Sequence, residues 1–326
     1  MAIIEVKDLI KEFVVVRKKT GLGNAIRSLV LPEKKIVRGV DGLSFDIEQG
    51  DIVGYIGPNG AGKSTTIKML TGILYPTAGS IRVCGLSPQK ERKAVVRQLG
   101  VVFGQRTQLY WDLRLGETFE LLKRIYRIED KRFKATLDML NDVLRIQDFI
   151  DTPVRQLSLG QRMRGDLAAS MIHEPTVLFL DEPTIGLDAD AKHAIRGFIR
   201  TMNRERRMTV VLTTHDLDDV EQLCSRLLVV NHGRLVEDGP LDSIVGKLAP
   251  HRLLVIELSE TAQAPEHARA KILRQDGLKV WYQFDKTAIS ASELISDLSG
   301  MLPIRDLSVQ EPDIEDAIRE VYRTTG

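Results

Sequence analysis

Cysteine and long apolar runs are both scarce in this sequence. Among 326 residues there are only two cysteines, Cys84 and Cys224, which lie far apart and outside any CxxC motif. This pattern excludes a disulfide framework and suits a reducing cytosol, so we expect both to be buried small residues. No uninterrupted apolar run approaches the roughly 18 residues of a membrane-spanning helix, so the chain is not expected to cross a bilayer.

The sequence also lacks an excess of either charge. Its 46 basic and 45 acidic residues leave a net charge of +1, which creates no global field for nucleic acid or an acidic membrane surface. The opening MAIIEVKDLIKEF carries acidic residues in its apolar stretch and has no small-residue cleavage site, so no signal peptide is expected. Because single cores rarely exceed roughly 250 to 300 residues, we expect a two-part organisation.

A glycine-rich loop is the clearest motif that the sequence does contain. GPNGAGKS at 57–64 fits the pattern G-x-x-x-x-G-K-[ST]. It follows the apolar stretch 52–56 and precedes a segment in which Ile67, Leu70 and Leu74 recur at helical spacing. A strand, a loop and a helix N-terminus in this order present backbone N–H groups to a polyphosphate.

This loop supplies most of the predicted nucleotide-binding residues. They are Gly57, Pro58, Asn59, Gly60, Ala61, Gly62, Lys63, Ser64 and Thr65. We expect Lys63 to contact the β- and γ-phosphates, Ser64 to bind Mg²⁺ and Thr65 to bind the α-phosphate. The alternative is an ordinary glycine-rich turn with an unrelated lysine.

A second motif, TVLFLDEPT, places two acids after an apolar run. Residues 177–180 lie between Pro175 and Pro183, a pattern typical of a strand buried on both faces of a parallel sheet. Ligands bind beyond the carboxyl ends of such strands. We therefore expect Asp181 to reach Mg²⁺ through water and Glu182 to act as the general base for an attacking water. The alternative is a surface turn with two solvated acids.

With LSLGQ at 157–161 between these motifs, about the first 240 residues resemble the ATP-binding subunit of an ABC transporter. The resemblance implies an α/β P-loop NTPase of the ABC ATPase type, with an antiparallel β subdomain and a helical subdomain. It also implies that Phe13 stacks on adenine, that Gln105 touches Mg²⁺ and the attacking water, and that His215 contacts the γ-phosphate. Phe13 also fits a core aromatic, and His215 a satisfied histidine at a strand end.

The same resemblance assigns the signature loop to a second copy of the chain. It implies that Ser158, Gly160 and Gln161 contact the ATP of the opposite subunit, and that Asp188 lies in a loop that crosses the dimer interface. Leu159 replaces the first glycine of the usual LSGGQ. We expect a competent site in which Leu159 packs over the ribose or the facing loop; the alternative is a degenerate loop without hydrolysis.

Residues of about 106–172 are predicted to form the helical subdomain. Two apolar stripes at helical spacing support this, Leu115, Phe119, Leu122 and Tyr126 in the first and Phe133, Leu137, Leu140 and Leu144 in the second. In the family this subdomain receives a cytoplasmic helix of the permease. Tyr110 and Trp111 either line that docking cleft or belong to the subdomain core.

An insertion at 17–38 has seven basic residues and one acid, Glu33. It is either a solvated loop or a short amphipathic piece that touches a partner or lipid headgroups. Together with LSLGQ, the insertion resembles the ABC-2-type exporter branch of the family.

The segment 241–326 carries none of the nucleotide motifs and is predicted to be a small α+β domain after a nucleotide-binding domain at 1–240. Its apolar patterns predict strands at 251–258, 278–284 and 304–309 and helices at 291–302 and 311–322. The tail is similar to those of ABC-2-type ATPases, which implies a dimerisation or regulatory role.

The family resemblance implies an ATPase that dimerises on two ATP and Mg²⁺ and drives a separate membrane permease. It implies export, a peripheral position on the cytoplasmic face of the cell membrane, and no nucleic-acid partner. A soluble ABC-type machine is the first alternative, but the sequence has neither a heptad run nor a second P-loop motif. An ATP-gated regulatory switch is the second.

Overall fold

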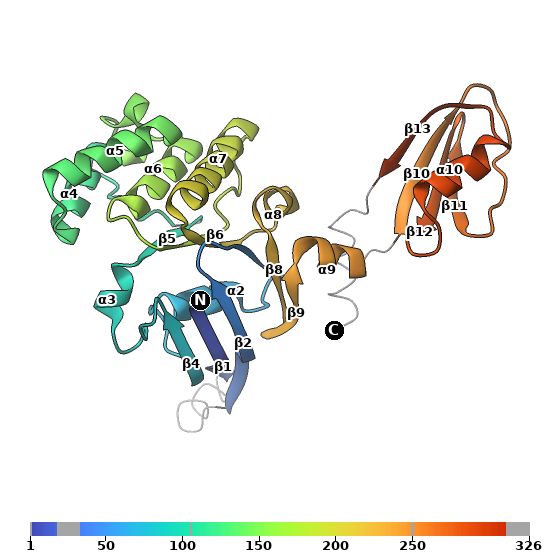
Figure 1. The fold of residues 1–326 in the computed structure, drawn as a ribbon. Helices are drawn as coiled ribbons and strands as arrows, with labels where there is room; N and C mark the ends of the chain where they lie inside the picture. The colour runs from blue at the N-terminus through green and yellow to red at the C-terminus, as the bar shows by residue number, and fades with distance from the viewer. Residues whose placement is uncertain (1, 18–32, 105, 249–250, 311–326) are drawn as a thin grey trace, which may run out of the picture. The chain divides into compact units, whose positions relative to one another are not determined.

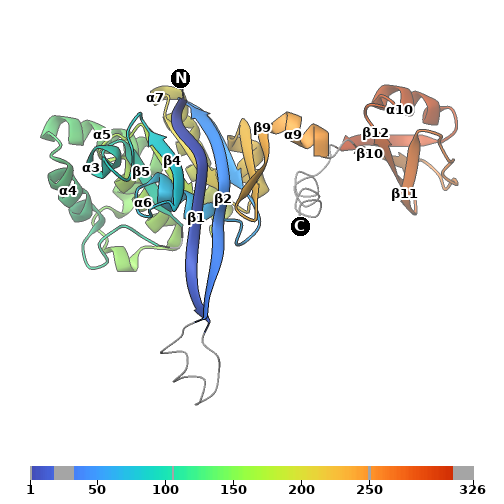
Figure 2. The same cartoon turned by 90° about the horizontal axis from the view of Figure 1, so that it is seen from below.

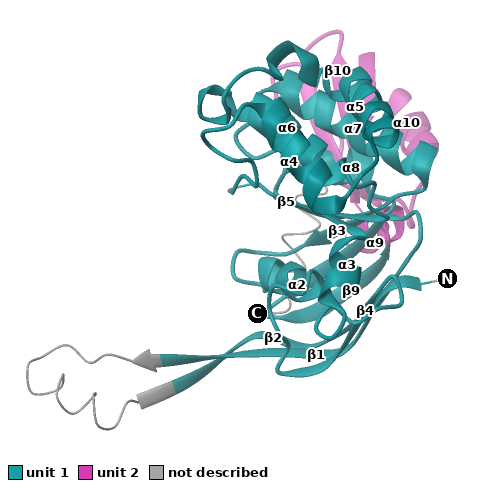
Figure 3. Cartoon of the chain, turned by 90° about the vertical axis from the view of Figure 1, so that its left-hand side faces the viewer, with its two compact units in different colours: residues 1–239 teal, residues 240–326 magenta. Residues whose placement is uncertain are grey.

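The computed structural model describes residues 2–17, 33–104, 106–248 and 251–310. The chain divides into two compact units, Met1–Gly239 and Pro240–Gly326, which Figure 3 colours teal and magenta. Within the described ranges, no helix is long and apolar enough to span a membrane.

The first unit is built on a six-stranded sheet with the order β5-β6-β7-β3-β8-β9 (Figure 1). The strands are β3 (Ile52–Ile56), β5 (Leu99–Phe103), β6 (Val177–Asp181), β7 (Thr209–Thr213), β8 (Arg226–Asn231) and β9 (Arg234–Pro240). Strands β5, β6, β7, β3 and β8 pair in parallel. Residues 177–180 of β6 are buried, as predicted for a strand covered on both faces, and β3 and β7 are also buried along their whole length. Their carboxyl ends therefore meet at one edge of the sheet.

A second sheet, with the order β2-β1-β4, forms the antiparallel part of this unit. Its strands are β1 (Ala2–Arg17), β2 (Glu33–Glu48) and β4 (Ala78–Val83). Alternate residues such as Ile4 and Val6 pack into one core with Tyr55 and Ile67. Figure 2 shows β1 and β2 continuing side by side beyond this core, where Val14 and Ile36 are exposed.

The helices of this unit are α2 (Lys63–Leu70), α3 (Arg92–Val96), α4 (Leu115–Tyr126), α5 (Asp130–Leu144), α6 (Leu159–Met171), α7 (Ala189–Arg206) and α8 (Leu217–Leu223). In Figures 1 and 3, α4 to α7 are grouped on one side of β5 and β6. The predicted stripes of α4 and α5 face inward, with Phe119 and Leu140 buried. Gly165 of α6 allows close packing, because a β-carbon there would lie 2.9 Å from Leu115 and 3.1 Å from Leu109.

Two details differ from the sequence-based expectations, and a third excludes one of two open alternatives. Helix α2 ends at Leu70, because Gly72 takes a φ of 70°, so Leu74 packs on the core from outside the helix. Cys84 is only partly buried, whereas Cys224 is buried. Tyr110 and Trp111 are 46% and 51% exposed, so they do not belong to the subdomain core.

The second unit contains a four-stranded sheet with the order β11-β12-β10-β13. Its elements are α9 (Leu241–Leu248), β10 (His251–Leu258), β11 (Ala270–Asp276), β12 (Lys279–Asp285), α10 (Ala291–Ser299) and β13 (Ile304–Gln310). Helix α10 packs Leu294 and Leu298 against Ile256 and Tyr282 of the sheet. Strand β11 was not predicted because it is a mostly exposed edge strand with little apolar alternation. The predicted helix at 311–322 lies outside the described residues.

Candidate functional site

The loop between β3 and α2 holds Lys63 in a buried position. Its ammonium donates hydrogen bonds to the carbonyl oxygens of Gly57 and Pro58, at 2.6 and 3.1 Å. Burial lowers the pKa of Lys63, and the carboxylates of Glu182 and Asp181 offset only part of that effect. The ammonium thus lies within the loop, where it can exchange its carbonyl partners for phosphate oxygens.

Two glycines of this loop are required by its geometry. A β-carbon on Gly57 would lie 2.3 Å from the carbonyl oxygen of Val230, and one on Gly62 would lie 2.3 Å from that of Gly39. Gly62 also takes a φ of 99°, which favours glycine. The other predicted loop residues line the same turn, with Asn59, Gly60 and Ser64 exposed, Pro58 and Thr65 half-buried and Ala61 buried.

Ser64 and Asp181, the predicted metal ligands, lie side by side. The carboxylate of Asp181 accepts hydrogen bonds from Ser64 Oγ at 3.0 Å and from Thr213 Oγ1 at 2.5 Å. Mg²⁺ prefers oxygen ligands and usually takes one or two carboxylates together with substrate phosphates and water, so this donor pair fits it. Gln105, the third predicted ligand, lies outside the described residues.

Glu182 follows Asp181 in a strained left-handed conformation with a φ of 57°. Its N–H donates to the carbonyl oxygen of Thr213 at 2.9 Å, which fixes the turn to the end of β7. Gly104 packs so closely here that a β-carbon would lie 2.1 Å from the carbonyl oxygen of Glu182. Glu182 Oε1 lies 3.0 Å from Nε2 of His215, whose side chain is 45% exposed. Two of the three predicted catalytic residues, Glu182 and His215, thus face each other across the ends of β6 and β7.

The signature residues begin α6. Ser158 Oγ accepts a hydrogen bond from the N–H of Gln161, and the N–H of Ser158 donates to Gln161 Oε1, at 3.2 and 3.0 Å. This reciprocal cap fixes the helix N-terminus. Leu159 is exposed and lies close to Gly186 of the same chain, where an added β-carbon would be 3.3 Å from its Cδ2. Asp188 caps α7 by accepting from the N–H of Ala191 at 2.8 Å.

The P-loop and the signature loop line separate cavities. Ser64, Asp181 and Glu182 line one of about 320 Å³. Ser158, Gly160, Gln161 and Asp188 line another of about 690 Å³. The two cavities share no lining residue.

Phe13 lies on the exposed part of β1. Its ring covers Gly39, where an added β-carbon would come within 2.8 Å, and Lys11 Nζ lies 5.5 Å from the ring centroid. The side chain is 37% exposed, which contradicts the alternative of a core aromatic.

Asp166 of α6 is a buried acid that sequence reasoning did not single out. Its Oδ1 accepts hydrogen bonds from Thr107 Oγ1 and the N–H of Gln108, both at 2.9 Å. One turn earlier, the Arg162 guanidinium lies over the ring of Trp111 at 5.9 Å. These contacts hold the segment 107–111 along α6. Burial raises the pKa of Asp166 to about 6.

Because the pKa of Asp166 is raised on folding, its protonated form favours the folded state. This contribution is full below the unfolded pKa of 3.8 and is lost as the pH rises through about 6. Asp166→Asn cannot ionise, so its free energy of unfolding relative to wild type should rise by about 1–2 kcal/mol between pH 5.0 and 7.5. Urea unfolding at both pH values measures this difference, and a difference that stays constant would contradict it.

Comparison with known proteins agrees with this geometry. A family model described as ABC transporter matches residues 40–185. The ABC transporter ATP-binding protein NatA of Bacillus subtilis (strain 168) is 32% identical over 212 residues, which cover 65% of this chain and 86% of NatA. The chain belongs to the ABC transporter ATP-binding proteins.

Other relatives of this ABC ATPase are consistent with that membership. The Nod factor export ATP-binding protein I of Paraburkholderia xenovorans (strain LB400) is 38% identical over 206 residues, 63% of this chain and 67% of that protein. A solved structure of an ATP-binding subunit of an ABC transporter superposes with a TM-score of 0.62 at 26% identity and covers 75% of this chain and 92% of that one. The predicted family, fold and ATPase class are thereby confirmed.

Proposed function

We propose that this ABC ATPase is the motor subunit of an ABC-2-type exporter, dimerising on two Mg-ATP to power a separate permease. The separation of the P-loop cavity from the signature cavity carries the proposal. In one chain, Ser158 and Gly160 line a different cavity from Ser64, so the signature contact to ATP requires a second copy. A head-to-tail dimer brings each signature loop to the ATP of its partner.

The nucleotide-binding residues are those of 57–65, with Phe13 against adenine. Ser64 and Asp181 hold Mg²⁺, which when bound neutralises charge that develops on the phosphates. Lys63 donates to phosphate oxygens in place of the carbonyls of Gly57 and Pro58. Gln105, which lies outside the described residues, is the third proposed metal ligand.

Glu182 is the general base, and its carboxylate takes the proton of the attacking water. His215 orients that carboxylate through the 3.0 Å contact. The bond to the Thr213 carbonyl and the close packing of Gly104 fix the backbone of Glu182. Glu182 also lines the cavity that contains Ser64 and Asp181.

The segment 107–111 is the proposed docking site for a cytoplasmic helix of the permease. It presents Tyr110 and Trp111, 46% and 51% exposed, and exposed aromatic side chains are enriched at protein interfaces. Domain 1–240 binds nucleotide, and domain 241–326 acts in dimerisation or regulation. The printed name of the Nod factor export ATP-binding protein supports export. We further propose that the ATPase is held peripherally on the cytoplasmic face of the membrane and has no nucleic-acid partner.

The test is an affinity purification of tagged Glu182→Gln chain from detergent-solubilised native membranes in Mg-ATP. We expect mass spectrometry to find multi-spanning membrane proteins that are lost with the double variant Glu182→Gln/Trp111→Ala. A matched control, Glu182→Gln/Tyr75→Ala, changes an exposed aromatic outside 107–111 and should retain them. Recovery of soluble partners alone would favour the soluble-machine alternative.

A further inference from the structure

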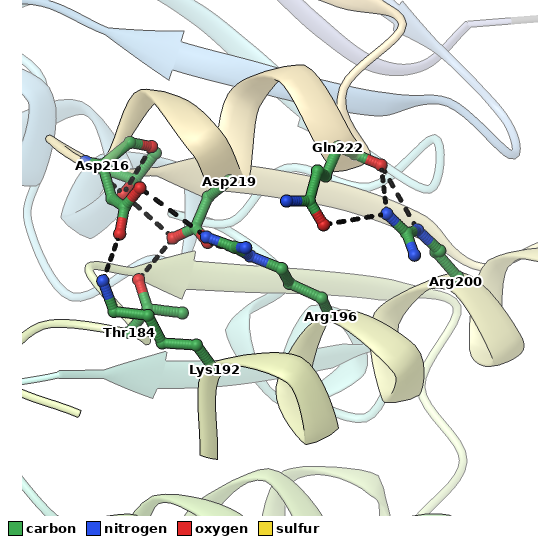
Figure 4. A network of polar contacts seen from close by, with 8 residues as sticks. Thr184, Lys192, Arg196, Arg200, Asp216, Asp219 and Gln222 are labelled. Carbon is green, nitrogen blue, oxygen red and sulfur yellow. Dashed lines mark hydrogen bonds and ion pairs between the residues drawn. The ribbon is translucent and has the colours of Figure 1, made fainter. Parts of the chain in front are cut away.

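A buried carboxylate is hydrogen-bonded to the segments that carry Glu182 and His215. It belongs to Asp219 of α8, which is 0% exposed (Figure 4). Asp219 Oδ2 accepts hydrogen bonds from the hydroxyls of Thr184 and Thr214, the latter at 3.3 Å. Asp219 Oδ1 accepts a bond from Arg196 Nε of α7 at 2.6 Å. One carboxylate therefore joins the segment after β6, helix α7 and the segment after β7.

The two threonines flank the proposed catalytic residues. Thr184 lies two residues after Glu182, and Thr214 directly precedes His215. Because both hydroxyls bond to the same oxygen of Asp219, the ends of β6 and β7 are tied together at this point. These two hydrogen bonds are therefore made within two residues of Glu182 and of His215 in the sequence.

A second ion pair holds the other side of His215. Asp216 pairs with Lys192 of α7, and Arg196 Nη2 lies 3.6 Å from Asp216 Oδ1. Burial alone would raise the pKa of Asp216, but the hydrogen bond from Lys192 and the charges of Lys192 and Arg196 outweigh it and lower the pKa. Asp216 is thus ionised at neutral pH, and both neighbours of His215 are anchored to this network.

Packing alone holds His215 weakly, because its side chain is 45% exposed. The position of the ring depends on the backbone at Thr214 and Asp216, which the network fixes. The positive charge of the Arg196 guanidinium compensates the negative charge of the Asp219 carboxylate. Without Arg196, this buried carboxylate would be unpaired, at a high cost in stability. The arrangement therefore provides both a stable buried charge and a fixed histidine.

We infer that Asp219 is a positioning residue for ATP hydrolysis, holding the Glu182 and His215 segments in register through Thr184 and Thr214. The inference rests on the proposed role of Glu182 as the general base. The effect of Asp219 is to keep the carboxylate–imidazole contact when the surrounding loops bind nucleotide.

The sharpest test removes the threonine hydrogen bonds to Asp219 and keeps the ion pair between Asp219 and Arg196. Thr184→Val and Thr214→Val retain the shape of the side chain and leave Asp219 paired with Arg196. We expect each to lower kcat for ATP hydrolysis about 10-fold, since small misplacements of catalytic groups are costly, with KM for ATP within about twofold of wild type. Thr184→Ser and Thr214→Ser keep a hydroxyl and should restore most of kcat.

Asp219→Asn is a poorer test, because it leaves the buried Arg196 with only the longer 3.6 Å contact to Asp216 and can unfold the chain. A matched control is Asp238→Asn, which breaks the bond pair from Arg226 at 2.8 Å between β8 and β9. That variant should lower the melting temperature without changing kcat. It separates a general loss of stability from a loss of positioning.

The outcomes distinguish this inference from the function on which it rests. Wild-type kcat in both valine variants, or a changed melting temperature alone, would overturn the positioning role. If Glu182→Gln hydrolyses ATP at the wild-type rate, the assignment of the general base fails first. If Glu182→Gln is inactive while both valine variants are fully active, only the role of Asp219 fails.

Discussion

Glu182→Gln lowers the rate of ATP hydrolysis by about 10² to 10⁴-fold and leaves the affinity for Mg-ATP near that of wild type. Glutamine has the same shape but cannot take a proton from water. The backbone bond to the Thr213 carbonyl, at 2.9 Å, is unaffected by the change. Phosphate release measures the rate, and equilibrium nucleotide binding measures the affinity.

The same variant provides a measure of assembly. In Mg-ATP it should sediment with the mass of two chains, because ATP bound across the interface is no longer consumed. Glu221→Gln, an exposed position on α8, is the matched control and should hydrolyse ATP at the wild-type rate. Wild-type hydrolysis by Glu182→Gln would show that another group activates water, and a monomer in Mg-ATP would contradict the proposed dimer.

Lys63→Ala weakens the binding of ATP by about 10- to 100-fold. Its ammonium makes charge-assisted hydrogen bonds, each of which contributes about 1.5–3 kcal/mol when its partner is charged. Alanine cannot replace either the bonds or the charge. Isothermal titration with Mg-ATP measures the change in affinity.

Two further variants test whether the loss of affinity in Lys63→Ala is specific to the side chain at this position. Lys63→Arg keeps the charge but not the compact shape that fits beside Gly57 and Pro58, so its affinity should fall between those of wild type and Lys63→Ala. Lys93→Ala removes an exposed lysine on α3 and should bind ATP as wild type does. Unchanged affinity in Lys63→Ala would show that the loop does not grip the phosphates as proposed.

The sequence predicted those parts of the molecule that depend on neighbouring residues. The P-loop is one continuous motif between a buried strand and a helix, so Lys63 and Ser64 could be placed from local pattern alone. Strand β6 was predicted because four apolar residues lie between two prolines. The same short-range signals place Asp181 and Glu182 at its carboxyl end.

The parts that the sequence could not supply depend on pairing over long distances. Asp166 and Asp219 both lie on helices, where an acid is usually solvated, and only the fold brings Thr107 or Arg196 to them. Gly104 likewise gives no sign of its role until β5 and β6 bring it to the carbonyl oxygen of Glu182. The proximity of Leu159 to Gly186 likewise depends on the fold, while its expected contact with the ribose or the facing loop stays a prediction.

Turnover requires the release of ADP as well as the capture of ATP. A lysine with no other partner would be left as a buried, unsatisfied cation when the product departs, and this would slow departure. In this chain the Gly57 and Pro58 carbonyls receive the Lys63 ammonium at 2.6 and 3.1 Å. The carbonyl oxygens of the loop therefore compete with ADP for the Lys63 ammonium. Each cycle can end with ADP released and the buried ammonium still hydrogen-bonded.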